Sequence, residues 1–108
     1  MSLTFLKQRC SIKNSLAVNE FSEPTFGNYE DIKCRLEIST QYIRDENGKT
    51  AIADALLFLK PDQEIRLDSL VEDEETEQFK VVRIDSIRNF KGQLHHKEVY
   101  LRFTDQNE

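Results

Sequence analysis

The sequence contains no tryptophan, only three glycines, two prolines and two cysteines among 108 residues. Two cysteines without a Cys-x-x-Cys spacing are too few for a disulfide framework, so Cys10 and Cys34 are expected to be buried free thiols. Three glycines cannot supply a glycine-rich cradle for phosphate groups. No apolar run approaches the ~18 residues that a membrane-spanning helix needs.

The sequence also lacks the local motifs of common enzymes and of targeting signals. No nucleophile elbow, zinc-protease motif, P-loop or dinucleotide fingerprint occurs in it. The N-terminal stretch has no long apolar core and no small-residue cleavage site, so no secretory signal is predicted. We therefore expect a protein that is not an enzyme, holds no cofactor and is made in a reducing compartment.

Acidic residues outnumber basic ones by 20 to 15, which gives a net charge of −5. An acidic surface repels phosphate, so tight sequence-independent binding of nucleic acid is not expected. Basic residues gather within 7–13 and 83–97, and we interpret both groups as solvated strand faces. The length predicts one domain, residues 1–108, with a modest core.

Apolar residues recur at every second position in several segments, which predicts strands with one buried face and one wet face. The strongest pair lies within residues 79–103, where two strands meet at a connection around Gly92. Further strands are expected at 9–13, 32–43, 50–59 and 64–71. The core of the strongest pair is predicted to comprise Val82, Ile84, Val99, Leu101 and Phe103, the last three facing inward.

Two of these segments carry further signals. In 32–43, Cys34, Leu36 and Ile38 fall on one face. In 50–59, alanine and leucine favour a helix on propensity, but the preceding Asn-Gly and the following Pro61 favour a strand. The alanines of this segment are small enough to let a neighbouring element approach closely.

The clearest turn in the sequence is the Asn-Gly turn, because Asn-Gly accepts the positive φ angles of a tight hairpin. Residues 60–63 also form a turn by composition. Residues 72–78, with five acids in the first six positions, are predicted to form an exposed acidic loop. The alternative of calcium binding lacks the spaced ligand pattern of a calcium loop. The residues of the Asn-Gly turn are Asp45, Glu46, Asn47, Gly48 and Lys49.

A long loop is predicted at residues 14–31, after a lead-in at 1–8. Little periodicity, Pro24 and an internal glycine indicate a loop, yet the segment carries three aromatic residues. Loops of this length are uncommon in compact domains unless they are functional or disordered. Phe21, Phe26 and Tyr29 either pack back on the barrel or belong to an arm that contacts a partner.

The strand segments and the absence of a long amphipathic helix predict an all-β protein. The expected architecture is a small antiparallel β-barrel, or a closed sandwich, with long loops. Closing the sheet would protect the edges of such short strands.

The two histidines are the remaining candidates for chemistry. His95 and His96 are adjacent, so on a strand they are expected to point to opposite faces and not to chelate one ion together. His96 and Glu98 share a face, and a third ligand from another acid could complete a metal site. We favour a histidine on a solvated strand, and we predict neither a metal site nor catalytic residues.

Several short segments, taken in order, form a pattern that covers residues 32–103. The most specific is Gly-x-x-x-His-x-Glu-Val-Tyr-Leu at 92–101. Together they resemble the head-closure proteins of long-tailed bacteriophages and prophages, also called stoppers or head–tail connectors. The chain departs from the family where relatives often have Pro-Gly-Asp, since Arg66-Leu67-Asp68 stands there and an acidic loop follows. The other segments are CRLE at 34–37, DENGK at 45–49, ALLFLKP at 55–61, IRLD at 65–68 and KVVRI at 80–84.

The resemblance implies a small β-barrel subunit of a virion, assembled in the host bacterial cytoplasm. Copies would form a ring below the portal and adaptor proteins, close the DNA-filled head and receive the tail. A loop would narrow the channel, and residues 14–31 and 45–49 are the candidates. DNA would pass without specific binding, because an acidic wall offers phosphates few cationic partners. No membrane is involved.

Three other functions are weighed against this one. The first is a tail-completion or terminator protein of the same structural class. The second is a small barrel that binds single-stranded nucleic acid, for which a cationic groove and exposed aromatic residues would be needed. The third is a metal-dependent enzyme of the cupin type.

Overall fold

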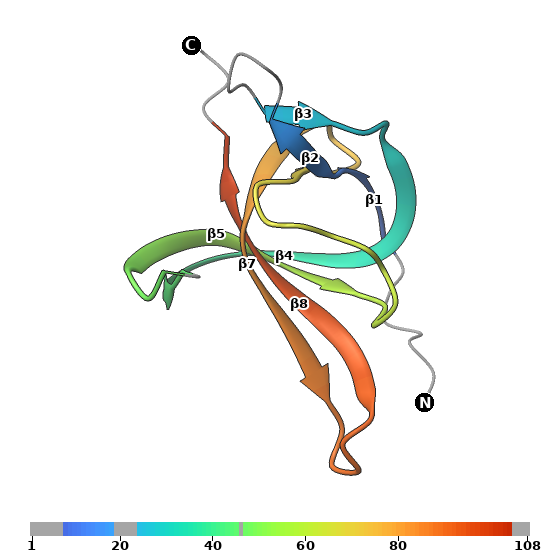
Figure 1. Ribbon diagram of the computed structural model, residues 1–108, viewed down its shortest axis with the longest axis vertical. Coiled ribbons are helices and arrows are strands. Elements are labelled where there is room, and N and C mark those ends of the chain that lie inside the picture. The colour runs from blue at the N-terminus through green and yellow to red at the C-terminus, as the bar shows by residue number, and fades with distance from the viewer. Residues whose placement is uncertain (1–7, 19–23, 46, 105–108) are drawn as a thin grey trace.

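The computed structural model describes residues 8–18, 24–45 and 47–104, and these residues form strands and turns without a helix (Figure 1). The expected all-β fold is confirmed. The strands, in chain order, are β1 (Gln8–Lys13), β2 (Ser15–Val18), β3 (Pro24–Phe26), β4 (Glu30–Arg44), β5 (Thr50–Leu59), β6 (Leu70–Glu72), β7 (Gln78–Arg88) and β8 (Leu94–Phe103).

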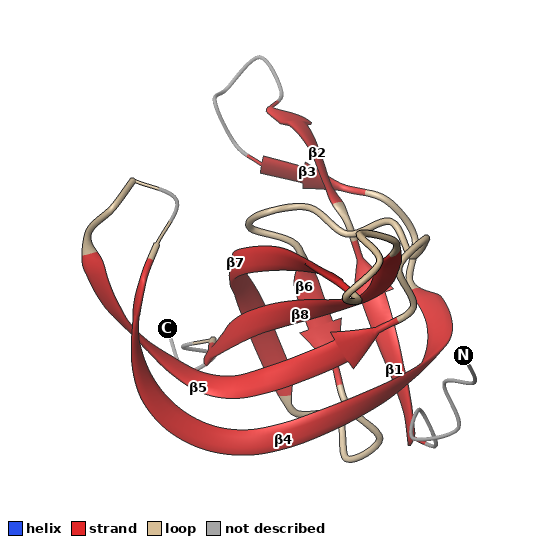
Figure 2. Cartoon of the chain, turned by 90° about the horizontal axis from the view of Figure 1, so that it is seen from below, coloured by secondary structure: helices blue, strands red, loops and turns tan. Residues whose placement is uncertain are grey.

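Strands β1-β4-β5-β8-β7-β6 form a closed barrel, and β2 and β3 form a separate two-stranded sheet. All neighbouring strands of the barrel are antiparallel, and β6 closes it by pairing with β7 and with β1. Figure 2 shows the strands wrapping around the core. The predicted barrel is therefore confirmed. The segment 50–59 is a strand, as predicted, whereas only Leu70–Glu72 of the expected strand at 64–71 is one.

The core fills the inside of this barrel with side chains from every barrel strand. On β5, every second residue from Ala53 to Leu59 is fully buried. Cys10 and Cys34 are free and buried, as expected. The Cys34 hydrogen bond and burial both raise the pKa of the Cys10 thiol well above its usual range. The other core residues are Ile12, Ile32, Leu57, Leu59, Ile65, Val71, Phe79, Val81, Val99 and Leu101.

Three β-bulges interrupt the pairing of the long strands, two where β4 and β7 leave the barrel and one near the tip of the β7–β8 arm. The pairing of β4 with β5 shifts between Ile38 and Gln41, and that of β7 with β8 shifts between Val81 and Arg83 and again between Ile87 and Arg88. A bulge bends its strand and changes which face the following side chains occupy. The outer parts of β4–β5 and β7–β8 therefore project as two hairpin arms (Figure 1).

The bulges correct part of the predicted core. Val99 and Leu101 are fully buried and Ile84 packs against the core, but Val82 is only partly buried because it is the extra residue of a bulge. Val81 takes the inward position instead. Phe103 pairs with Phe79 and their rings stack at 5.0 Å between centroids, yet Phe103 is 45% exposed because it lies at the rim.

The same effect explains Ile38, which was predicted on the buried face of its strand. Cys34 is fully buried and Leu36 is partly buried, but Ile38 is 61% exposed. Its partner across the strands is Ala55, the last pair before the bulge, so Ile38 stands where β4 leaves the core.

Residues 14–31 were predicted to form a long loop. They instead contain β2, β3 and the start of β4. The strands β2 and β3 are short and pair with an irregular register, which explains why the sequence shows no period of two. Pro24 begins β3, a position where the missing N–H is tolerated. We call residues 15–26, where described, the flap. The acidic loop is shortened to 73–77, since Glu72 ends β6 and Gln78 begins β7.

Replacing Leu57 by alanine is expected to lower the free energy of unfolding by about 3 kcal/mol, because a fully buried side chain leaves a cavity in the core. The neighbouring Leu56→Ala is the matched control, since its side chain lies on the outer face and is only partly buried. Urea denaturation followed by circular dichroism measures both. Equal losses for the two variants would contradict the inward assignment of Leu57.

Candidate functional site

The surface features that stand out are the arms and their exposed apolar side chains. On the β4–β5 arm, Tyr42 is 77% exposed and pairs across the strands with Ile52, which is 42% exposed. On the β7–β8 arm, Phe90 at the tip is 94% exposed. Large apolar side chains gathered on projecting ribbons are typical of surfaces that contact a partner.

Three hairpin turns in the described part of the chain share one hydrogen-bond pattern. In each, an Asp or Asn carboxyl or amide oxygen accepts the backbone N–H groups two and four residues later. The fourth residue has a positive φ angle, which glycine adopts without strain. The turns are 45–49 with Gly48, 73–77 with Thr76, and 89–93 with Gly92.

The two arm tips share a further contact. Arg44 Nη1 donates to the Gly48 carbonyl at 2.9 Å, and Arg88 Nη1 donates to the Gly92 carbonyl at 2.7 Å. The arginine preceding each turn thus holds the turn closed from outside. Both tips are therefore well-defined shapes on which exposed side chains can be presented.

The β4–β5 arm bends over one end of the barrel. Arg83 Nη1 donates to the Arg44 carbonyl at 2.7 Å, which ties the arm to β7. A cavity of about 430 Å³ lies between the arm tip and the barrel rim. Its wall includes Asp45 and Asn47 from the predicted turn and Phe103 from the predicted core hairpin. Asp68 and Lys80, which form an ion pair at 3.3 Å, also line it.

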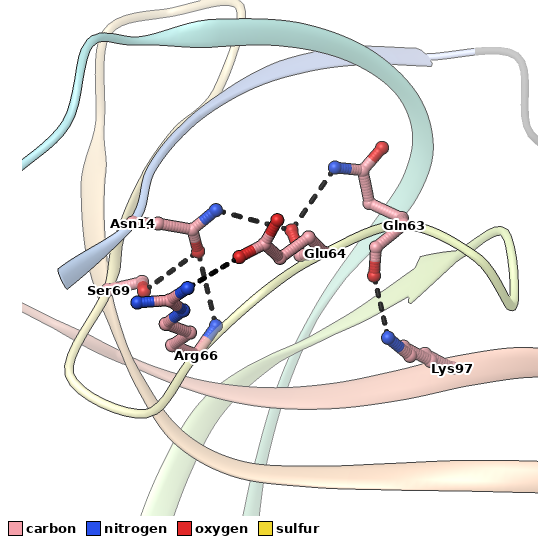
Figure 3. Close-up of polar contacts among 6 residues, drawn as sticks. All are labelled: Asn14, Gln63, Glu64, Arg66, Ser69 and Lys97. Carbon is pink, nitrogen blue, oxygen red and sulfur yellow. Dashed lines mark hydrogen bonds and ion pairs between the residues drawn. The ribbon is translucent and has the colours of Figure 1, made fainter. Parts of the chain in front are cut away.

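The flap is anchored at its base by Asn14, which lies between β1 and β2 (Figure 3). Asn14 Oδ1 accepts the Arg66 backbone N–H at 3.1 Å and the hydroxyl of Ser69 at 3.0 Å. The Asn14 carbonyl accepts the Gly27 N–H at 3.0 Å. Ser69 is fully buried, so this contact fixes the flap to the loop before β6.

The same loop is fixed to β8 at its other end. Lys97 Nζ donates to the Gln63 carbonyl at 2.7 Å, and Arg66 Nη2 contacts Glu64 Oε1 at 2.8 Å. Figure 3 shows these contacts in one line from β1 across the loop to β8. The loop thereby connects the flap to the base of the β7–β8 arm.

Two of the predicted aromatic residues, Phe26 and Tyr29, contact other side chains, and Tyr29 is also exposed to solvent. Lys13 Nζ lies 5.8 Å from the ring centre of Phe26 and 5.2 Å from that of Tyr29. Tyr29 is 43% exposed, and its hydroxyl accepts a hydrogen bond from Gln78 at 3.2 Å. Partial burial and the nearby Glu72 raise the pKa of Tyr29. Phe21 lies outside the described residues, as does Glu46 of the arm turn.

The histidines differ from the prediction. Their rings were expected on opposite faces, but the Nδ1 atoms of His95 and His96 lie 2.6 Å apart and the rings meet edge to face. The register shift leaves His95 as the extra residue of a bulge, which turns it toward His96. His96 Nε2 lies 2.9 Å from Glu98 Oε2, so these two share a face as predicted.

The structure does not bring the candidate residues into one site. The flap and the β4–β5 tip project separately from the barrel (Figure 2). Across residues 8–18, 24–45 and 47–104, no group of three or more histidine, cysteine or acidic residues is placed to hold a metal ion. Sequence patterns missed the exposure of Tyr42, Ile52 and Phe90, although Phe90 in an Asx-x-x-Gly turn was a usable signal.

No family model matches the chain, and neither a curated protein nor a solved structure shows significant similarity to it. Over the described residues, no helix is present that is long and apolar enough to cross a membrane.

Replacing Asn14 by alanine is expected to lower the free energy of unfolding by about 1 kcal/mol, because the Ser69 hydroxyl and the Arg66 N–H lose an acceptor. Amide exchange at Gly27 and Arg66 should become faster in the same variant. Asn47→Ala, at an exposed turn position, is the matched control and should change little. Unchanged exchange at Gly27 in the Asn14 variant would contradict an anchoring role.

Proposed function

We propose that the chain is a structural subunit of a bacteriophage head–tail connector, of the head-closure type. Copies form a ring below the portal and adaptor proteins, close the DNA-filled head and receive the tail. The observation that carries the proposal is a small closed barrel with two projecting arms and a flap, in which the arms expose large apolar side chains such as Tyr42 and Phe90. Such a molecule presents much contact surface on a small rigid body.

The sequence resemblance and the structure support this proposal in different ways. The most specific motif, at 92–101, covers most of β8, from the tip of the β7–β8 arm into the barrel. The flap and the 45–49 turn, the two candidates for a channel-narrowing loop, both project from the barrel (Figure 2). The net charge of −5 suits a channel through which DNA slides.

A second candidate function is binding of single-stranded nucleic acid by the β7–β8 arm. The observation in its favour is the tip, where Phe90 stands between Arg88 and Lys91. Base stacking on an exposed aromatic ring beside cations is a common way to hold single strands. A titration at low salt separates the two functions, since micromolar affinity favours this second one.

Deleting the gene from the phage or prophage that encodes it is expected to produce heads that lose packaged DNA, together with unattached tails. The reason is that, without the ring, nothing closes the portal and the packaged DNA leaves the head. Electron microscopy and nuclease sensitivity of the particles measure this. Normal infectious virions from the deletion strain would contradict the proposed function.

Complementation with variants locates the contact surface. Tyr42→Ser should restore few virions, because it removes the most exposed large apolar side chain of the β4–β5 arm while leaving the core intact. Lys33→Ser, at an exposed position on the same strand, is the matched control and should restore full titre.

A further inference from the structure

The tip of the β7–β8 arm combines an apolar side chain with cations that have no acidic neighbour in sequence. Residues 86–97 contain Arg88, Lys91 and Lys97 and no acidic residue. Phe90 is 94% exposed, and Lys91 Nζ lies 5.8 Å from the centre of its ring. In the described part of the chain, neither Arg88 nor Lys91 forms an ion pair with a carboxylate.

The acidic turn at 73–77 lies at the other end of β7. A cavity of about 290 Å³ opens beside it, lined by Gln8, Arg9, Leu36, Asp73, Glu74 and Glu75. Leu36 supplies apolar surface, and Glu74 Oε1 accepts the Arg9 backbone N–H at 3.1 Å. Three carboxylates against one guanidinium make the cavity wall acidic.

Two other cavities lack this complementarity to the tip. The cavity below the β4–β5 arm has two acids and two bases, and the one beside Lys33 has two acids and three bases. Among these three, the cavity beside the acidic turn therefore fits a cationic tip best, and its volume accommodates a phenyl ring.

The tip cannot reach this cavity within the same chain. β7 runs from the acidic turn to the arm tip over 11 residues, and a strand rises about 3.3 Å per residue. The two features are thus separated by roughly 30 Å of paired strand, and Figure 1 shows the tip pointing away from the barrel. An occupant of the cavity that carries this tip must be a second copy.

We infer that the β7–β8 tip of one copy docks into the acidic cavity of the next, with Phe90 against Leu36 and with Arg88 and Lys91 facing the carboxylates. The two surfaces differ, so the contact is head-to-tail and builds a ring or a filament. This inference deepens the proposed function. It rests on that function for one assumption, that the second copy belongs to the same ring.

Cysteine cross-linking tests the contact with the full chain. Protein carrying Gln93→Cys, which keeps Phe90, is mixed with protein carrying Glu75→Cys under mild oxidation, and intact mass spectrometry counts mixed dimers. Mixed dimers should exceed those from the control pair Gln93→Cys and Asp62→Cys, since all three positions are exposed. The inference is overturned if the two pairs give equal yields.

Charge reversal in the same cross-linking assay tests the electrostatic part of the contact. Adding Lys91→Glu to the Gln93→Cys protein should lower the mixed-dimer yield about fivefold. Adding Glu74→Lys to its Glu75→Cys partner should then restore much of it, and this exchange keeps the Asp73 oxygen that closes the turn. Both positions are exposed or half-exposed, so the fold is retained, which circular dichroism checks. No change on reversal would count against the contact.

Three outcomes separate this inference from the other proposals. Binding of a labelled single strand that Lys91→Glu abolishes, without any preferred cross-link, would assign the tip to nucleic acid and overturn the inference. Normal virions from Lys91→Glu, when gene deletion gives none, would overturn the docking contact and leave the proposed function standing. Preferred cross-linking with no effect of gene deletion would retain the contact and reject the connector function.

Discussion

The barrel depends on β6, a strand of three residues that hydrogen-bonds to β7 on one side and to β1 on the other. At this closure, Ile12, Val71 and Phe79 pair in one row across the three strands, and each is almost fully buried. Without the row, β1 and β7 would present unpaired edges, which are templates for aggregation. A short strand suffices because its apolar residue meets partners on both sides.

The inner part of each long strand belongs to the barrel, and its outer part belongs to an arm. The bulges between Ile38 and Gln41 and between Val81 and Arg83 lie at these boundaries, since a bulge lets a strand change its direction and its buried face without ending. On these four strands the core residues lie in the inner parts, whereas Tyr42, Ile52 and Leu94 are exposed in the outer parts. Stability and contact surface are thereby separated along the same strands.

Sequence patterns predicted the fold well because alternation reports burial directly, as at Val99 and Leu101 of β8, and because Asn-Gly marks a hairpin. They failed where alternation breaks. Val82, Ile38 and His95 lie at or beside bulges, whose position depends on the partner strand and not on local composition. The flap was missed because its strands are short and irregular. The exposure of Tyr42 follows from the length of an arm beyond the barrel, which no local pattern encodes.

The repeated turns set an order of folding. Each closes a loop of a few residues, and its Asp or Asn oxygen satisfies two backbone N–H groups locally. The barrel closure joins Ile12 to Val71, far apart in the chain, and has a larger entropic cost of loop formation. We therefore expect the three hairpins to form first, within about microseconds, and the β1–β6 pairing to form last. Until it forms, the nascent chain carries exposed edges on preformed hairpins.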